Sequence, residues 1–412
     1  MTTSTSRPGT VTAGTPDTTD TTARIFSRDF IFMWAASFSG FFSFYVIQQP
    51  TLPLYVESLG GSAAEIGWVA GVFSVASLLC QPLVGRAVDT LGPRTVILTG
   101  SLLFLLCAPI YAVASALPLL IALRMVHGAG MAMFTTSGTT YATDLAPAKR
   151  RAQTISYFGI GGNLALGLGP LAASLLLAAH VSYEKIFLVA TAIALASVLL
   201  IVPAGESRQR RGRQHDWSLR TFFDSRAVTP ALLLLTASFT YGTLGTFLPV
   251  WIPRAGLETS TVAWFWLVYA AALVFTRLFS GRLADRFGRP AAIIPGLILV
   301  SSAMFLLSFL NSVSLLVLSA ALYAAGFAFV CPTLFALAAD RVAASKRGIA
   351  FATLEAFFGA GIGISAMMNG VLANALGYPV VFILSGAVPL IGLAGSLVIL
   401  YHRNSASGGD PS

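Results

Sequence analysis

Long apolar runs alternate with short polar segments over most of the chain. Each run has roughly the 20 residues that an α-helix needs to cross the hydrocarbon of a bilayer. The runs are continuous, whereas the strands of a membrane β-barrel alternate polar and apolar residues. The pattern therefore predicts an all-α integral membrane protein with twelve transmembrane helices, at residues 30–56, 64–84, 95–113, 118–142, 154–178, 186–203, 229–252, 259–280, 291–310, 313–338, 348–374 and 380–401.

The polar segments divide the chain into five parts. Residues 1–27 are rich in Thr, Ser, Gly and Pro and lack the apolar core of a signal peptide, so they predict a disordered tail. Residues 204–228 are the longest polar connector and carry six arginines. This connector separates two bundles of six runs, at 28–203 and 229–403, and residues 404–412 form a second short tail.

Two of the polar segments are copies of each other. Gly281–Pro290 (GRLADRFGRP) holds three arginines and an aspartate. Such residues cost about 2.5–3.5 kcal/mol each at the centre of a bilayer, so the segment predicts a charged hairpin at the membrane surface. We expect both of its glycines to permit a tight turn and a close approach of the helices. A degraded copy, Gly85–Arg94, lies 196 residues upstream.

Other landmarks recur at the same spacing of 196 residues. The matched residues are charged residues or prolines, which chance similarity between apolar helices does not explain: Pro53 and Pro249, Asp144 and Asp340, and Arg151 and Arg347. The chain therefore consists of two similar halves, an organisation that is typical of secondary transporters.

The composition fits a membrane protein. Hydrophobic residues make up 56% of the chain and charged residues 10%, against about 25% charged in a soluble domain. The formal charge of +9 is not accompanied by clusters of aromatic and basic residues, so we expect no nucleic-acid partner. The three cysteines, Cys80, Cys107 and Cys331, are scattered through apolar runs and predict neither a disulfide framework nor a metal site.

Lysine and arginine are distributed unequally across the predicted membrane. Twenty-one of the 25 lie in the tails and loops of one side, and only Lys185 and Arg254 lie on the other. Since basic loops stay in the cytoplasm, both termini are expected on the cytoplasmic side of the cell inner membrane. The remaining two, Arg124 and Arg277, fall inside predicted spans.

Two six-helix halves, a basic connector and a Gly-x-x-x-Asp-x-x-Gly hairpin after runs two and eight resemble the major facilitator superfamily. The second hairpin matches that family's signature loop closely, whereas the first departs from it at Thr90 and Pro93. The resemblance implies a cytoplasmic gate in which the aspartate closes onto a neighbouring helix end. The gating residues it implies are Gly85, Asp89, Gly92, Arg94, Gly281, Asp285, Arg286, Gly288 and Arg289.

Two further segments bear on proton coupling and direction. Arg124, followed by Gly128 and Gly130, resembles a motif of proton-coupled members, and the resemblance implies a role for Arg124 in proton transfer. His127 could titrate near neutral pH, although a lone histidine is more often a packing residue. The Gly169-Pro170 pair resembles the antiporter motif only in part; it favours export over import, and it also fits close helix packing around a proline kink.

Glu355 is the one acidic residue well inside a predicted span. An unpaired carboxylate in hydrocarbon is costly, so this group must be neutral, paired or in a wet cavity. Desolvation favours a protonated carboxyl, which suits a proton carrier. We therefore predict that Glu355 couples transport to protons or contacts the substrate. The alternative is a structural pair with Arg124 or Arg277.

A substrate cavity is expected between the halves, near the middle of the membrane. Its candidate polar lining is Tyr45, Gln48, Gln49, Asn163, Tyr241 and Asn369. Tyr45 and Tyr241 are themselves a repeat pair at the 196-residue spacing.

These features favour a secondary active transporter that works by alternating access. The preferred function is proton-driven antiport that exports a small amphipathic organic compound, a drug or a metabolite. The alternative is a proton-coupled importer of a small metabolite, and a remote one is a membrane receptor or scaffold that does not transport. No nucleophile–base set, metal cluster or phosphate loop suggests an enzyme or a cofactor. The expected partners are the substrate and membrane lipid, and the chain is expected to be a monomer.

Overall fold

The computed structural model describes residues 26–147, 150–205, 225–343 and 347–407. The described part of the first half contains α1 (Arg28–Val46), the π-helical turn η2 (Ile47–Thr51), α2 (Leu52–Ser58), α3 (Ala63–Leu91), α4 (Pro93–Tyr111), α5 (Leu117–Leu145), α6 (Arg151–Ala178) and α7 (Tyr183–Ile201). The second contains η4 (Ser225–Ala227), α9 (Val228–Arg254), η5 (Thr259–Thr261), α10 (Val262–Phe287), α11 (Pro290–Ser308), α12 (Val313–Arg341), α13 (Arg347–Leu376) and α14 (Tyr378–Ser407).

The helices are long and apolar, as the sequence predicts. Within the described residues, eleven segments are long and apolar enough to cross a membrane, and α1, η2 and α2 together make one of them. α14 supplies a further, shorter apolar stretch, Tyr378–Ala394. The prediction of an all-α membrane fold is thereby confirmed. Residues 1–25 of the predicted tail at 1–27, most of the connector (206–224) and the last residues (408–412) lie outside the described part.

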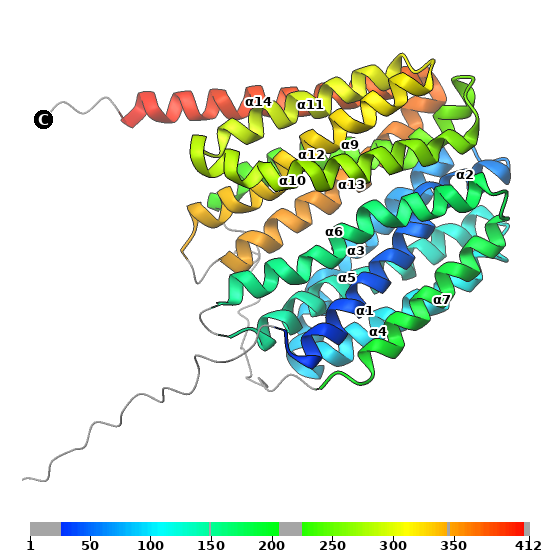
Figure 1. Ribbon diagram of the computed structural model, residues 1–412, viewed down its shortest axis with the longest axis horizontal. Coiled ribbons are helices and arrows are strands. Elements are labelled where there is room, and N and C mark those ends of the chain that lie inside the picture. The colour runs from blue at the N-terminus through cyan, green and yellow to red at the C-terminus, as the bar shows by residue number, and fades with distance from the viewer. Residues whose placement is uncertain (1–25, 148–149, 206–224, 344–346, 408–412) are drawn as a thin grey trace, which may run out of the picture.

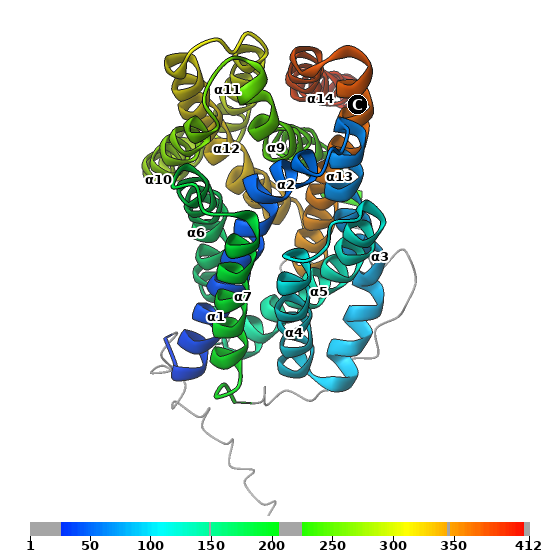
Figure 2. The same ribbon diagram turned by 90° about the vertical axis from the view of Figure 1, so that its right-hand side faces the viewer.

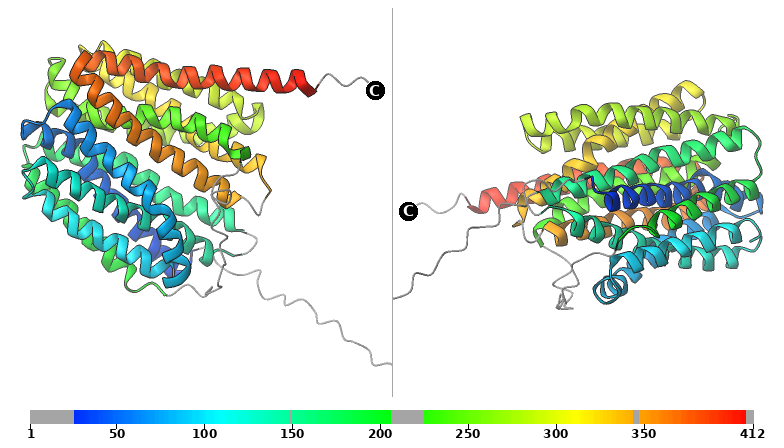
Figure 3. Two further views of the ribbon diagram at one scale, coloured as in Figure 1. Left: turned by 180° about the vertical axis from the view of Figure 1, so that it is seen from behind. Right: turned by 60° about the horizontal axis from the view of Figure 1, so that its bottom comes forward.

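The two halves lie side by side and differ in separation along their length. In Figure 1 the first half (blue to green) is below the second (green to red), and the ribbons converge at one end and spread at the other. The view from behind in Figure 3 shows the same divergence. We call the spread end, where α3 meets α4 at Gly92 and α10 meets α11 at Gly288, the hairpin end. The opposite end, which carries Glu57 and Arg254, is called the ion-pair end.

The apolar core follows this division. Around the ion-pair end, one buried cluster unites residues of both halves, such as Val46 and Phe187 with Phe247. Toward the hairpin end the core splits, with one cluster around Phe134 in the first half and another around Leu354 in the second. The halves therefore pack as one body at the ion-pair end and as two at the hairpin end.

The charged hairpins are mostly helical, which corrects one detail of the sequence analysis. α3 continues to Leu91 and α10 to Phe287, because charged side chains do not interrupt backbone hydrogen bonding. Each helix ends at a glycine in the left-handed region, Gly92 (φ 86°) and Gly288 (φ 87°), where other residues are strained. Gly85 and Gly281 lie inside the helices, and a Cβ added at either would meet nothing within 4 Å. The expectation that both glycines of the second hairpin shape its turn is therefore wrong for Gly281, which also makes no close helix contact in this conformation.

Candidate functional site

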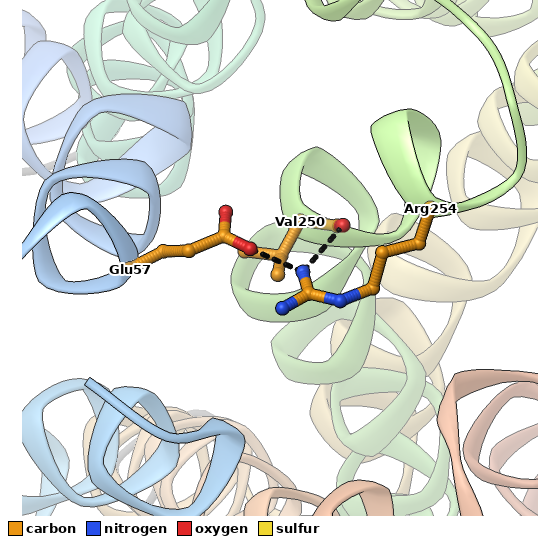
Figure 4. A network of polar contacts seen from close by, with 3 residues as sticks. All are labelled: Glu57, Val250 and Arg254. Carbon is orange, nitrogen blue, oxygen red and sulfur yellow. Dashed lines mark hydrogen bonds and ion pairs between the residues drawn. The ribbon is translucent and has the colours of Figure 1, made fainter. Parts of the chain in front are cut away.

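The ion-pair end is closed by contacts between the halves. Glu57 at the end of α2 pairs with Arg254 at the end of α9, and Arg254 also donates to the Val250 carbonyl at 3.0 Å (Figure 4). The Arg254 guanidinium lies over the Tyr378 ring, 5.0 Å from its centroid. Figure 2, which looks onto this end, shows α2 lying between the two halves. A solute could not enter here without breaking these contacts.

A seam of glycines extends this closure along α3 and α13. A Cβ at Gly67 would collide with the Ala366 carbonyl oxygen and lie 3.0 Å from the Cα of Gly370. A Cβ at Gly363 would lie 2.6 Å from the Cβ of Ser74. Only glycine lets these two backbones approach so closely. The seam lies in the part of each helix nearer the ion-pair end, so it fixes the halves together there.

Glu355 faces the space between the halves. Its side chain is exposed on α13, and its carboxylate interacts electrostatically with Tyr45 of α1 and Cys331 of α12. It lies about 12 Å along α13 from the hairpin end, at about 1.5 Å per residue. No residue in the described part of the chain forms an ion pair or hydrogen bond with it. The predicted alternative, a structural pair with Arg124 or Arg277, is not seen among the described contacts.

Arg277 and Asn163 meet across the gap between α10 and α6. The Arg277 Nη2 donates to the Asn163 Oδ1 at 3.1 Å, and the Arg277 Nε is buried without a hydrogen-bond partner among the described residues. Asn163 also donates to the Gly159 carbonyl one turn earlier, at 2.9 Å. A half-buried guanidinium is thus held by a neutral amide, with no carboxylate beside it in the described part of the chain.

Four tyrosines form a layer deeper in the bundle, which we call the tyrosine layer: Tyr45, Tyr241, Tyr269 and Tyr323. Tyr241 and Tyr323 both stack with the Phe327 ring. The Tyr269 hydroxyl is buried and has no hydrogen-bond partner among the described residues. It interacts electrostatically with Tyr45 of the opposite half and with Arg277 on its own helix. The layer therefore joins both halves above the charged groups.

Sequence reasoning missed Tyr269 and Tyr323, although a signal was present. Tyr323 lies 196 residues after His127, and Tyr269 lies 196 residues after Phe73. Both first-half residues contact the environment of Arg124, since His127 packs on Phe73 and Phe73 lies under the Arg124 guanidinium. Extending the repeat from the predicted candidates to their neighbours would have found the two tyrosines.

The adjacent residues Gln48 and Gln49 form hydrogen bonds with different halves of the protein. η2 interrupts the first membrane helix, and Gln49 has non-helical dihedrals (φ −148°, ψ 123°). Gln48 accepts a hydrogen bond from Arg124 inside the first half. Gln49 accepts one from the Tyr241 hydroxyl of the second half at 3.1 Å, in a space that Gly245 leaves free. Both side chains are buried, so they connect elements and do not line an open surface in this conformation.

Arg124 and His127 are buried inside the first half. The Arg124 Nε donates to the Val69 carbonyl at 3.1 Å, and its guanidinium lies 4.2 Å above the Phe73 ring. Arg124 is 0% exposed and His127 is 1% exposed. The His127 ring packs among the aromatic rings of Phe44, Phe73, Phe104 and Tyr111. A role for either residue in proton coupling stays a prediction, and in this conformation neither reaches the gap.

Asn369 lies within the second half. Its Nδ2 donates to the hydroxyls of Thr243 (2.7 Å) and Ser385 (2.9 Å), and the side chain is 1% exposed. The structure therefore does not bring Asn369 together with Asn163, Tyr45 and Glu355. Its predicted contact with substrate stays untested.

The gating residues lie at the open hairpin end. Asp89 is exposed there, Arg94 donates to the Val202 carbonyl of its own half at 2.6 Å, and Arg289 pairs with Asp340 at 3.0 Å. Arg286 is exposed and lies beside the Phe287 ring. The side chain of Asp285 lies outside the described part of the structure.

The Gly169-Pro170 pair serves packing in this structure. α6 continues through Pro170, and a Cβ at Gly169 would lie 2.5 Å from the Cβ of Tyr45. Gly169 thus allows α6 to approach α1 beside the tyrosine layer. An antiporter function for the pair stays a prediction.

Comparison with known proteins identifies the family. The model of the Major Facilitator Superfamily matches residues 33–283 and, in a second match, 231–411. An uncharacterised MFS-type transporter of Burkholderia mallei is 28% identical over 376 residues, which cover 87% of this chain and 88% of the relative. An uncharacterised MFS-type transporter of Salmonella typhimurium is 27% identical over 355 residues, 83% of this chain and 89% of the relative.

Solved structures show the same fold at low identity. The nucleoside transporter NupG superposes with a TM-score of 0.72 at 13% identity, covering 91% of this chain and 99% of NupG. The human organic anion transporter MFSD10 superposes with a TM-score of 0.64 at 19% identity, covering 89% of this chain and 98% of MFSD10. The chain belongs to the Major Facilitator Superfamily.

Proposed function

We propose that the protein is a proton-driven antiporter that exports a small amphipathic organic compound by alternating access. Membership of the family and the names of the two relatives, both MFS-type transporters, support transport as such. The strong excess of Lys and Arg on one side supports an inner-membrane protein with both termini in the cytoplasm.

In this orientation the structure is an inward-open conformation. The hairpin end would face the cytoplasm, and the closed seam and ion pair would face outward. An exporter loads its substrate from this state. The opposite state requires the hairpin end to close, and Asp89 and Asp285 are the residues proposed to close it.

The exposed, unpaired Glu355 is the observation that carries the proposal. It faces the gap from the second half, within electrostatic range of Tyr45 from the first. A carboxyl that can hold either a proton or a cationic substrate group makes the two ligands compete. Competition at one site gives exchange when the empty carrier does not switch conformation, because the carrier then returns only with the other ligand bound.

Proton-coupled import is the second candidate, and Arg277 favours it. An anion bound at Arg277 near Glu355 would be repelled by the ionised carboxylate and favoured by the protonated one. Proton and anion would then bind together, which couples them in the same direction. MFSD10, whose fold this chain shares, is named as an organic anion transporter, and NupG as a nucleoside transporter.

Everted membrane vesicles with a pH-sensitive dye test the proposal. Respiration acidifies the lumen, and compounds of different charge are added one at a time: a lipophilic cation, a neutral antibiotic, a zwitterionic metabolite and an organic acid. An exporter is expected to dissipate the gradient with one class. Glu355→Gln should reduce that response to the level of vesicles that lack the protein.

The controls separate the candidates. Gradient dissipation that persists in Glu355→Gln moves the coupling site, with Arg124→Gln and His127→Asn next to be measured. If no compound dissipates the gradient, while right-side-out vesicles accumulate one under an inward proton gradient, the protein is an importer and the proposed export is wrong.

A further inference from the structure

Two opposite charges face the same gap at nearly the same depth. Glu355 lies about 12 Å along α13 from the hairpin end, and Arg277 lies about 15 Å along α10 from it, at about 1.5 Å per residue. Both interact electrostatically with the Cys331 thiol of α12. Cys331 is therefore within electrostatic range of both charged groups.

Neither charge has a charged partner in the described part of the chain. The two do not pair with each other, and the described ion pairs involve Glu57 with Arg254 and Arg289 with Asp340. Arg277 has one amide acceptor, Asn163, and a buried Nε with none. Charges inside a span normally pair or face water, because leaving them alone is costly. A site whose cation and anion both lack a charged partner among the described residues is complementary to a ligand that carries both charges.

A largely buried aromatic cluster lies beyond this pair. The tyrosine layer is deeper in the bundle, and the Tyr269 hydroxyl is buried there without a partner among the described residues. Tyr269 lies about 12 Å from Arg277 along α10, at about 1.5 Å per residue, on the side of the ion-pair end. Tyr45 is the partly exposed member of the layer, so a flat apolar body attached to a charged group would pack against the layer there.

The sign of the coupling distinguishes the ligand classes. A purely anionic substrate at Arg277 would bind together with a proton on Glu355, which opposes exchange. A purely cationic substrate would compete with the proton but would leave Arg277 without an anion and be repelled by it. A zwitterion neutralises both groups, and its ammonium group competes with the proton.

We propose that the substrate is a zwitterionic amphipath that places an ammonium group at Glu355, an anionic group at Arg277 and its apolar body against the tyrosine layer. This inference rests on the proposed transport function and narrows its substrate class. It assigns Arg277 and Tyr45 to substrate binding, beside the Glu355 carboxylate.

Cys331 provides a direct readout of occupancy. In a Cys80→Ala, Cys107→Ala background it is the single cysteine of the chain. The purified protein in lipid nanodiscs is treated with N-ethylmaleimide, and the alkylation rate is measured with four matched probes: 4-(aminomethyl)benzoate (zwitterion), 4-methylbenzylamine (cation), 4-methylbenzoate (anion) and 4-methylbenzyl alcohol (neutral). Phenylalanine serves as a second zwitterion with a shorter charge separation. Ligand-induced thermal stabilisation is measured in parallel and needs no reaction at Cys331.

We expect at least one zwitterion to protect Cys331, or to raise the unfolding temperature, at a concentration at least about tenfold lower than the matched singly charged probes need. Arg277→Gln and Glu355→Gln should each remove that advantage, whereas Arg277→Lys and Glu355→Asp, which keep the charges, should retain part of it. The proposal is wrong if neither zwitterion outperforms its singly charged relatives in either assay. It is also wrong if the advantage survives in both neutral variants.

The binding assay needs no proton gradient, so its failure can be told apart from failure of antiport. Zwitterion selectivity without gradient dissipation would retain this substrate class and reject proton-driven export. Gradient dissipation by a cation or an anion, without zwitterion selectivity, would retain proton-driven export and reject the zwitterionic substrate class.

Discussion

The two halves share a backbone plan and place their charges differently. At positions 196 residues apart, the first half has Arg124 where the second has Ala320, and His127 where the second has Tyr323. Conversely, the second half has Glu355 where the first has Gly159. The first half encloses its charge, with Arg124 0% exposed and held by Gln48 and Val69. The second half presents its charges to the gap.

This difference indicates that the charge of the first half supports the fold, whereas the charges of the second half serve the solute. Arg124 binds η2 to α3 and α5, so it stabilises the broken first helix from within. Glu355 and Arg277 stabilise nothing comparable in the described contacts, and they remain available to a solute. We infer that the first half is chiefly the scaffold against which the second half's charges work.

The largest expected effect tests the enclosed charge. Arg124→Leu removes both donors and leaves the Gln48 amide and the Val69 carbonyl buried without them, at about 1–3 kcal/mol each. We expect a loss of stability of about 3 kcal/mol or more, measured by thermal unfolding of the purified protein. Arg277→Leu, at the gap, should cost about 1 kcal/mol, since it leaves only the half-buried Asn163 amide without this donor. Equal losses in the two variants would contradict the assignment of support to Arg124 and chemistry to Arg277.

The seam between the halves gives the next test. Gly67 of α3 has Ala263 as its repeat equivalent, so Gly67→Ala makes the two halves alike at this position. The new methyl group would collide with the backbone of α13. Overpacking of this kind typically costs about 1–3 kcal/mol. We expect it to separate the two halves at the ion-pair end. Distances between spin labels at the exposed Leu59 and Glu258 should lengthen.

Gly167→Ala is the matched control. Gly167 packs on Ala270 of α10. In the repeat, Gly167 corresponds to Gly363 and Ala270 corresponds to Ser74. A Cβ there would lie 3.4 Å from the Cβ of Ala270, an ordinary contact. The label distances should not change in this variant. If both alanine substitutions part the halves, the two interfaces are equally tight and the asymmetry is not real.

Gly159 allows the charge difference itself to be removed. It is exposed, and a Cβ added there meets nothing within 4 Å. Gly159→Glu adds a carboxylate one turn from Asn163, the residue that holds Arg277. We expect this carboxylate to neutralise Arg277 and to weaken protection of Cys331 by the zwitterionic probe about tenfold, or 1.4 kcal/mol. Gly159→Gln, of the same size, should have little effect. Equal weakening by both would indicate obstruction of the gap.

The fold was predictable because hydropathy and charge distribution act over whole helices. The edges were less so, since α3 and α10 run several charged residues beyond their apolar parts and end only at Gly92 and Gly288. Hydropathy reports where a helix meets the membrane surface. It does not report where backbone hydrogen bonding stops.

The site was predictable only in part. Glu355 stood out because a carboxyl in an apolar run is rare and costly. Gln48 and Gln49 were both predicted to line a cavity. The break at η2 instead directs Gln48 to Arg124 in the first half and Gln49 to Tyr241 in the second, which helical periodicity cannot indicate. The neighbours of Glu355 come from α1 and α12, so their proximity depends on tertiary packing alone.

The smallest expected effect concerns the one described ion pair between the halves. The repeat equivalents of Glu57 and Arg254 are Pro253 and Ser58, which carry no charge. The ion pair therefore has no symmetric counterpart at these positions. Its side chains are 28% and 45% exposed, and exposed pairs contribute about 0–1 kcal/mol. Glu57→Gln should therefore change the label distance between Leu59 and Glu258 much less than Gly67→Ala does, and its effect should shrink in high salt. A change as large as that of Gly67→Ala would mean that the ion pair, and not the glycine seam, holds this end closed.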